Sequence, residues 1–232
     1  IPIGFTFVYN SEAYTSLAVS TNGFICLGND ITSTANATNN LSTGTGVASP
    51  RPIIAPLWDN LNFNISTDLS YLTLGNAPNR TFIMQWQNAR WGAAAANPGI
   101  SFQARLYEAD SKIEFVYRSE LGLLNGPSAS IGLSNMGTGT KNFLCLTSTS
   151  NNTFDTSTLI ETNTLNTKPN NGQVYTFAPK FQTPIAPASL SFTNVTGTQI
   201  TLNWTDNTQI ETYYLVYMST DNINFNLAFT IP

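Results

Sequence analysis

Residues 101–118, SFQARLYEADSKIEFVYR, contain the clearest structural pattern in the sequence. Apolar and polar residues alternate in the first half of this stretch and again in the second half, which is the period expected of β-strands with one buried face. The polar residues 108–112 between the two halves are typical of a turn. The stretch therefore predicts a β-hairpin.

The spacing within this hairpin also predicts which side chains meet. The side that faces the core carries three residues of the first strand opposite three of the second: Phe102, Ala104 and Leu106 opposite Ile113, Phe115 and Tyr117. The other side points outward and carries Gln103, Arg105, Glu114 and Val116. One face of the hairpin is thus apolar and the other largely polar.

The same alternation recurs along most of the chain. We expect further strands at residues 3–9, 14–19, 24–27, 53–58, 71–74, 81–86, 130–133, 142–146 and 174–177. The Thr21-Asn22-Gly23 turn joins the second and third of these. Apolar residues never recur at helical spacing over a helix length. Residues 1–180 are therefore predicted to form an all-β domain, an antiparallel, jelly-roll-like β-sandwich.

Prolines mark the approach to the strand at residues 53–58. A polar stretch at residues 29–49 reads as a long surface loop, and Pro50 and Pro52 follow it. Proline cannot donate a ladder hydrogen bond, so it favours an edge strand or a strand that starts late.

The pattern changes after residue 180. Residues 181–187 contain two prolines and read as a linker, and alternating strands resume in residues 188–232. We therefore expect a second, shorter β unit there. Because the sequence begins at Ile1, without methionine or a signal peptide, we expect it to be a fragment of a longer processed protein.

The composition excludes several classes of function. Charged residues make up 9% of the chain, far below the ~25% of an average soluble domain, and the net charge is −4. The basic residues are scattered singly, so the chain lacks the basic stripe that nucleic acid binding requires. No apolar run approaches the ~20 residues of a membrane span. A polar surface of low charge is typical of proteins outside the cell.

The sequence contains no histidine. This removes the Ser-His-Asp and Cys-His catalytic arrangements, histidine-ligated zinc and imidazole bases. Paired carboxylates of a glycosidase would have to come from Asp59, Glu108, Asp110, Glu114 or Glu120. Glu108 and Asp110 fall in the predicted turn, where a structural role is favoured. We expect that the chain is not an enzyme.

Asp59, close to Asn60 and Asn62, offers oxygen ligands of the kind that calcium prefers. No recognisable calcium-binding repeat accompanies these residues, so a structural role for Asp59 stays open beside Ca²⁺ binding. Calcium is the one cofactor that the sequence suggests.

Tryptophan side chains offer a second kind of ligand contact. Trp58, Trp86 and Trp91 could form a platform on which sugar rings stack, or they could fill the core. Trp86 alternates with apolar neighbours and is expected inside. Trp91, beside Arg90 and a Gly-Ala segment, is the best candidate of the three for an exposed position, with core filling as its alternative. Trp91, Trp58 and Asp59 are therefore the candidate ligand-binding residues.

The two cysteines, Cys26 and Cys145, lie in apolar runs that read as strands. A disulfide between them would close a long loop and stabilise the fold. Two buried thiols that pack as small apolar side chains are the alternative. Two thiols without histidine cannot complete a zinc site, so no metal is expected there.

Residues 1–180 resemble a nidogen-type extracellular domain, or the related domains of large multidomain surface proteins of the Bacteroidota. The motifs that carry the resemblance are IGFTF at 3–7, YTSLAVSTNGF at 14–24, PIIAPLWD at 52–59, FQARLY at 102–107 and KIEF at 112–115. The resemblance implies an extracellular β-rich domain with a role in adhesion or matrix-like assembly. The bacterial version further implies export by type IX secretion.

Residues 188–232 resemble the N-terminal half of a fibronectin type III domain. The motifs are PASL at 187–190, ITLNW at 200–204 with a core tryptophan, and YLVY at 214–217 with a core tyrosine. The resemblance implies an incomplete fibronectin type III sandwich, a module that commonly serves as a spacer.

Together these features predict a secreted or cell-surface adhesion or structural module of a larger multidomain protein or surface filament. Its expected partners are other protein modules or surface glycans, with self-assembly or contact with export machinery as further possibilities. The alternative is a carbohydrate-binding accessory module of a secreted glycan-degrading enzyme.

Overall fold

The computed structural model describes residues 1–28, 31, 38–43, 51–64, 68–92, 94–149, 155–179, 187–207 and 213–231. The chain divides into two compact units, Ile1–Pro179 and Lys180–Pro232. Residues 181–186, most of the predicted linker, lie outside the described residues. No helix in the described part of the chain has the length and apolar character needed to cross a membrane.

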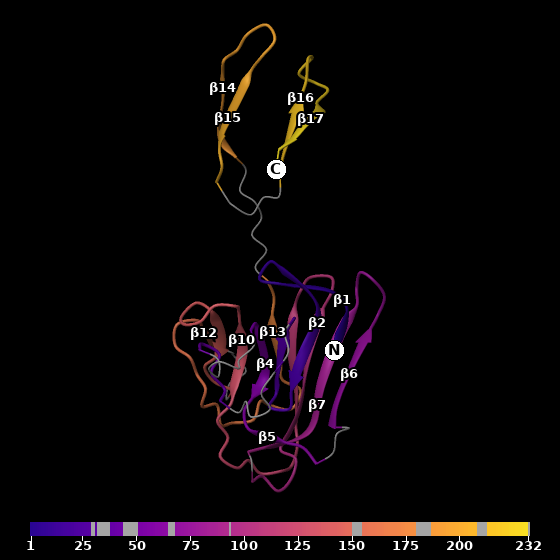
Figure 1. Ribbon diagram of the computed structural model, residues 1–232, viewed down its shortest axis with the longest axis vertical. Helices are drawn as coiled ribbons and strands as arrows, with labels where there is room; N and C mark the ends of the chain where they lie inside the picture. Colours follow the sequence, from indigo (N-terminus) through magenta and orange to yellow (C-terminus); the bar gives the residue numbers. More distant parts are fainter. Residues whose placement is uncertain are drawn as a thin grey trace. The chain divides into compact units, whose positions relative to one another are not determined.

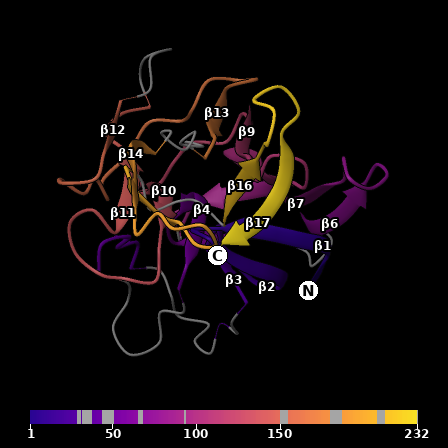
Figure 2. The ribbon, with the colours of Figure 1, turned by 90° about the horizontal axis from the view of Figure 1, so that it is seen from above.

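The first unit is an antiparallel β-sandwich (Figures 1 and 2). One sheet has seven strands in the order β1-β2-β3-β4-β10-β11-β12. The bounds of its strands are β1 Pro2–Tyr9, β2 Glu12–Ser20, β3 Phe24–Leu27, β4 Ile53–Trp58, β10 Ser130–Ser134, β11 Phe143–Leu146 and β12 Thr156–Ser157. The prediction of an all-β, antiparallel sandwich is confirmed.

The second sheet has six strands in the order β13-β9-β8-β7-β5, and β6 also pairs with β7. Their bounds are β5 Leu61–Asn62, β6 Leu69–Leu74, β7 Thr81–Trp91, β8 Ile100–Tyr107, β9 Ile113–Ser119 and β13 Val174–Phe177. Except for β13, all of these strands lie in the sequence between β4 and β10 of the other sheet.

The β8–β9 hairpin has the register that the sequence predicts. Phe102 pairs with Tyr117, Ala104 with Phe115, and Leu106 with Ile113. All six of these residues are buried, while Gln103, Arg105, Glu114 and Val116 on the other face are partly exposed. The predicted division into a core face and an outward face is therefore confirmed.

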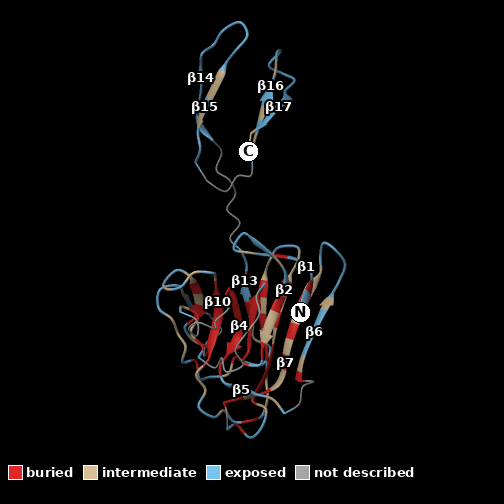
Figure 3. Ribbon diagram, viewed as in Figure 1, coloured by how far each residue is buried: buried red, intermediate tan, exposed pale blue. Residues whose placement is uncertain are grey.

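The core between the sheets is largely aromatic. The Phe102 ring stacks on Trp86 with a centroid separation of 5.1 Å, and Phe115 contacts Phe177 at 5.0 Å. Hydrogen bonds also join the sheets: Trp86 Nε1 donates to Ser20 O at 2.9 Å, the Tyr117 hydroxyl donates to Pro56 O at 2.5 Å, and the Thr73 hydroxyl donates to Ile3 O at 2.7 Å. Figure 3 shows that the buried residues concentrate in the strands of this unit.

Strand β4 lies between β3 and β10, in the interior of its sheet rather than at an edge. The strand starts late, at Ile53 after Pro52, as one of the two predicted alternatives requires. A register shift lies between the Ser130–Trp58 and Gly132–Ala55 pairs, so β4 has a bulge that contains Pro56. Bulges are sites where a sheet tolerates proline, because one residue is left out of the ladder.

A second apolar cluster covers the outer face of the seven-stranded sheet. It joins Trp58, Phe24, Phe143 and Cys145 with Leu41, a residue of the predicted surface loop. Leu41 is fully buried, so this part of the loop is not a solvent-exposed connection.

The second unit contains two two-stranded antiparallel sheets, β14 with β15 and β16 with β17. Their bounds are β14 Ala188–Thr193, β15 Thr201–Thr205, β16 Tyr214–Met218 and β17 Asn226–Ile231. The Trp204 and Tyr214 rings contact each other at 5.4 Å. Large apolar side chains such as Phe192, Tyr217 and Phe229 are more than half exposed.

Candidate functional site

The three tryptophans that the sequence offers for a sugar-stacking platform, Trp58, Trp86 and Trp91, are all fully buried. Trp58 packs against Phe24, with ring centroids 4.6 Å apart, and both belong to the apolar cluster that includes Leu41. Trp91 lies at the end of β7, in the core between the sheets. Of the two alternatives for these tryptophans, the structure agrees with core filling and not with an exposed platform.

A bulge in β7 explains why Trp91 faces inward. The β7–β8 register shifts between Trp86 and Ala89, and Asn88 has a positive φ of 57°. The extra residue exchanges the two faces of the strand, so that Ala89 and Trp91 follow Trp86 on the buried side. Strict alternation from Trp86 would have placed Trp91 outward.

Asp59 is buried, and its carboxylate anchors neighbouring segments of the chain. Its Oδ2 accepts hydrogen bonds from Trp91 Nε1 and from the Ser128 backbone N–H, both at 2.6 Å. Its Oδ1 accepts from the Asn60 N–H at 2.7 Å and from the Ser128 hydroxyl at 3.3 Å. A carboxylate has about four acceptor positions. Asp59 therefore fills its hydrogen-bonding capacity within the protein, and of the two roles left open for it the structure agrees with the structural one.

Cys26 and Cys145 are both buried and are not joined by a disulfide. Cys26 lies in β3 and Cys145 in β11, and β4 and β10 separate these strands in the sheet. Neighbouring strands are ~4.8 Å apart, so the two residues lie roughly 14 Å apart across the sheet. A disulfide requires Cα atoms within about 7 Å. Of the two readings, the structure agrees with buried thiols.

The carboxylates considered for catalysis each have a structural partner. Glu108 pairs with Arg80 at 2.5 Å, and Asp110 accepts a hydrogen bond from the Lys112 N–H within the β8–β9 turn. Glu114 pairs with Lys112 at 3.2 Å, and Glu120 with Arg118 at 2.7 Å.

The pKa values of three of these carboxylates are lowered. For Glu108 the main cause is its hydrogen bond from Arg80. For Glu114 and Glu120, partial burial raises the pKa, but hydrogen bonds from Tyr107 and Lys112, or from Ser101 and Arg118, outweigh it. The general acid of a glycosidase needs a raised pKa. These residues are therefore poorly suited to that role.

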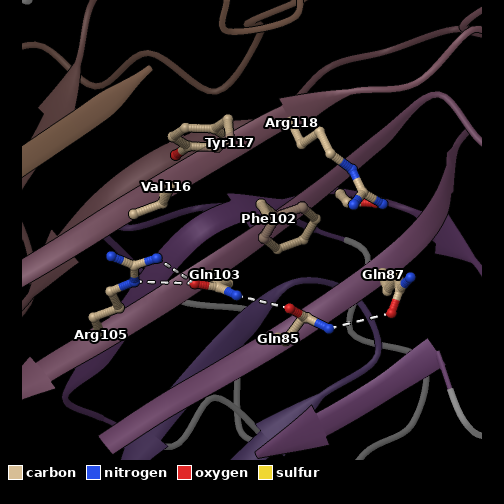
Figure 4. Close-up of a pocket in the computed structure, with 9 residues that line it drawn as sticks. Gln85, Gln87, Phe102, Gln103, Arg105, Val116, Tyr117 and Arg118 are labelled. Atoms are coloured by element: carbon tan, nitrogen blue, oxygen red, sulfur yellow. Dashed lines mark hydrogen bonds between the residues drawn. The ribbon is translucent and has the colours of Figure 1, made fainter. Parts of the chain in front are cut away.

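A polar array lies on the outer face of the six-stranded sheet, on strands β7 and β8. Arg105 donates to Gln103 Oε1 through Nε at 3.0 Å and through Nη2 at 2.8 Å. Gln103 Nε2 donates to Gln85 Oε1 at 2.7 Å, and Gln85 Nε2 donates to Gln87 Oε1 at 3.2 Å. Figure 4 shows this chain of four side chains, which we call the amide array.

The amide array borders a shallow hollow of about 200 Å³. Its polar lining residues are Gln85, Gln87, Ser101, Gln103, Arg105 and Arg118, with Val116 among the apolar ones. Arg118 donates to Glu120 Oε1 at 2.8 Å and to the Ser101 hydroxyl at 3.3 Å. The sequence predicts that Gln103, Arg105 and Val116 point outward. It does not predict that Gln85 and Gln87 of β7 lie beside them, because that depends on how the strands pair.

The described residues contain no group of three or more Asp, Glu or Cys side chains placed to hold a metal ion. A family model described as NIDO related, that is nidogen-related, matches residues 1–179. The chain belongs to the NIDO-related family. The nidogen-like resemblance of the first unit is thereby confirmed. No curated protein and no solved structure matches this chain.

Proposed function

We propose that this NIDO-related chain is a secreted or cell-surface adhesion or structural module of a larger multidomain protein or surface filament. It binds through the outer face of its six-stranded sheet. The observation that carries the proposal is the amide array, in which four side chains on neighbouring strands hold one another in place beside a shallow, solvent-facing hollow. Side chains ordered before binding lose less conformational entropy when a partner arrives.

Three further features support this proposal. The chain lacks histidine and its charged fraction is only 9%, both of which fit a non-catalytic extracellular protein. The carboxylates near the array have lowered pKa values, which suits ion pairing better than acid catalysis. The aromatic platform on which the accessory-module alternative rested is absent, since Trp58 and Trp91 are buried.

The finer features of the proposal rest on resemblance. We place residues 188–232 as the N-terminal half of a fibronectin type III domain, with the Trp204–Tyr214 contact as part of its core. We also propose an origin in a Bacteroidota-type surface protein exported by type IX secretion. The partners would be other protein modules or surface glycans, including further copies of this protein.

Retention under flow tests the proposed function. Beads that carry the 232-residue chain are passed over wells coated with basement-membrane extract or with the same chain, and beads that carry albumin serve as the control. We expect the chain to retain more beads than albumin on at least one coating. In parallel, soluble polysaccharide incubated with the chain should gain no new reducing ends. Retention equal to albumin on both coatings, or release of reducing ends, would overturn the proposal.

A further inference from the structure

The amide array forms rows across the sheet, because outward side chains on paired strands lie side by side. Gln85 pairs directly with Gln103, and Gln103 with Val116. In the next row Arg105 pairs with Glu114. Neighbouring strands are ~4.8 Å apart, so each row places one side chain every ~4.8 Å along a line perpendicular to the strands. A ligand that follows the first row meets the two amides of Gln85 and Gln103 and then the apolar side chain of Val116.

The hydrogen bonds within the array leave it rich in donors. Gln103 Oε1 accepts two N–H groups from Arg105, which fills its two acceptor positions. Each glutamine amide has two N–H donors, and the array uses one from Gln103 and one from Gln85. The surface therefore favours a ligand with many oxygen acceptors.

The charged side chains that line the hollow are cationic. Two arginines, Arg105 and Arg118, line it, and no carboxylate does. The nearest carboxylates, Glu114 and Glu120, are each paired with a cation, Lys112 and Arg118 respectively. Arg105 instead places its guanidinium against the neutral amide of Gln103, at the edge of the hollow. A guanidinium can bind a carboxylate with two parallel hydrogen bonds.

The hollow is smaller than the ~300 to 1,000 Å³ of pockets for drug-sized ligands. Its size therefore suits one sugar ring of a longer saccharide. Val116 offers an apolar patch beside the polar groups, against which the C–H face of a sugar ring can pack. Sugar hydroxyls accept and donate hydrogen bonds, as amides do, and only a charged substituent would use Arg105 fully.

We propose that the amide array, together with Arg118, is a binding site for an acidic saccharide, a sugar chain that carries carboxylate groups such as uronic acids. The carboxylate binds Arg105, the hydroxyls of the same ring bind Gln103 and Gln85, and the chain continues across the strands. This inference rests on the proposed function and names the chemical class of partner for the same face.

The test compares tetragalacturonate with its methyl ester, which keeps the hydroxyls but removes the charges. Calorimetric titration of the 232-residue chain should detect tetragalacturonate, with binding that weakens as salt rises, and at least about tenfold weaker binding of the ester. Arg105→Ala should weaken tetragalacturonate binding at least about tenfold. Lys141→Ala removes the same charge from an exposed position outside the array, and should change the affinity less than about twofold.

NMR of the wild-type chain tests the location without a variant. The side-chain NH₂ signals of Gln85 and Gln103 should shift on addition of tetragalacturonate. Equal binding of acid and ester, no shift of these signals, or no effect of Arg105→Ala in a folded variant would overturn the inference. If beads are retained under flow but tetragalacturonate does not bind, the inference fails while the proposed function stands. If neither occurs, both fail.

Discussion

Asp59 joins separate segments of the first unit through its buried carboxylate. It is 4% exposed and accepts hydrogen bonds from Trp91 and Ser128, which come from segments far apart in the sequence. A buried carboxylate is costly unless it is fully hydrogen-bonded, and Asp59 meets this condition. Its position directly after a buried strand therefore serves the architecture of the fold.

Replacing this carboxylate should destabilise the first unit strongly. Asp59→Ala leaves the Trp91 Nε1–H and the Ser128 N–H without their acceptor, and each unsatisfied buried donor costs about 1–3 kcal/mol. We expect the free energy of unfolding in urea to fall by about 3 kcal/mol. Asp155→Ala, which removes an exposed carboxylate, should change it by less than about 0.5 kcal/mol. Equal effects of the two variants would contradict this account of Asp59.

The lowered pKa values of Glu108, Glu114 and Glu120 predict how stability depends on pH. A carboxyl whose pKa is lower in the folded state stabilises the fold above its unfolded pKa, about 4.3. That contribution is lost as the pH falls through the lowered folded pKa. The wild-type chain should therefore lose stability in urea below about pH 4.3, and a triple E108Q/E114Q/E120Q variant should lose less over the same range. If the free energy of unfolding fell equally with pH in the wild-type chain and the triple variant, these three carboxylates would not be the cause of the pH dependence.

At the scale of elements, the turn between β2 and β3 depends on close packing against β4. Gly23 has a φ of +81°, and a Cβ at this position would lie 1.9 Å from Leu57 O. Gly126 has a similar φ of +63°, but nothing lies within 4 Å of its Cβ position. The two glycines share the same backbone requirement and differ in their surroundings.

This difference predicts the outcome of two matched substitutions. Gly126→Ala should lower the free energy of unfolding by about 1 kcal/mol, since alanine tolerates a positive φ poorly. Gly23→Ala should lower it by at least about 2 kcal/mol more, because the backbone of β4 must also move. Urea unfolding of both variants measures the difference. A Gly23→Ala variant as stable as Gly126→Ala would mean that the turn does not pack against β4 as described.

The β7 bulge is an element that alternation could not reveal. The register of the β8–β9 hairpin follows from the sequence because each strand keeps its period and the turn is short. In β7 the extra residue at Gln87–Asn88 exchanges the faces, so Trp91 is buried. The burial of Trp58 could not be predicted from alternation either, because Trp58 packs in a cluster with Leu41, which comes from a loop distant in the sequence. The amide array likewise depends on the pairing of β7 with β8, which alternation within one strand does not give.

The bulge should be sensitive to the type of residue at its left-handed position. Asn88 has a φ of 57°, its N–H donates to the Ser101 hydroxyl, and its amide donates to Asp68. Asn88→Val and Asn88→Gly both lose the bond to Asp68, but only valine strains the backbone. Asn88→Val should therefore be less stable in urea than Asn88→Gly by about 1–2 kcal/mol. Equal stability of the two would contradict the bulge geometry.

At the scale of the whole molecule, the two units differ in how much they bury. Two-stranded sheets are at best marginally stable in water, and the second unit consists of two of them with exposed apolar side chains. Hydrogen exchange of the 232-residue chain should therefore be much faster for the amides of β14–β17 than for those of β8 and β9. Comparable protection in both units would contradict this description of the second unit.

The proposed binding face, the outer face of the six-stranded sheet, can be tested by placing a charge on it. Val116→Glu places a negative charge in the middle of this face, beside Gln103. Thr15→Glu places the same charge at an exposed position on β2 of the other sheet. Both variants can be confirmed as folded by thermal unfolding before use.

Bead retention under flow, on the coating that retains the wild-type chain, compares the two variants directly. We predict that Thr15→Glu beads are retained as well as wild type, whereas Val116→Glu reduces retention at least about tenfold, because the added charge stands in the contact. Retention of Val116→Glu beads at the wild-type level, or an equal loss with Thr15→Glu, would contradict the claim that this face binds.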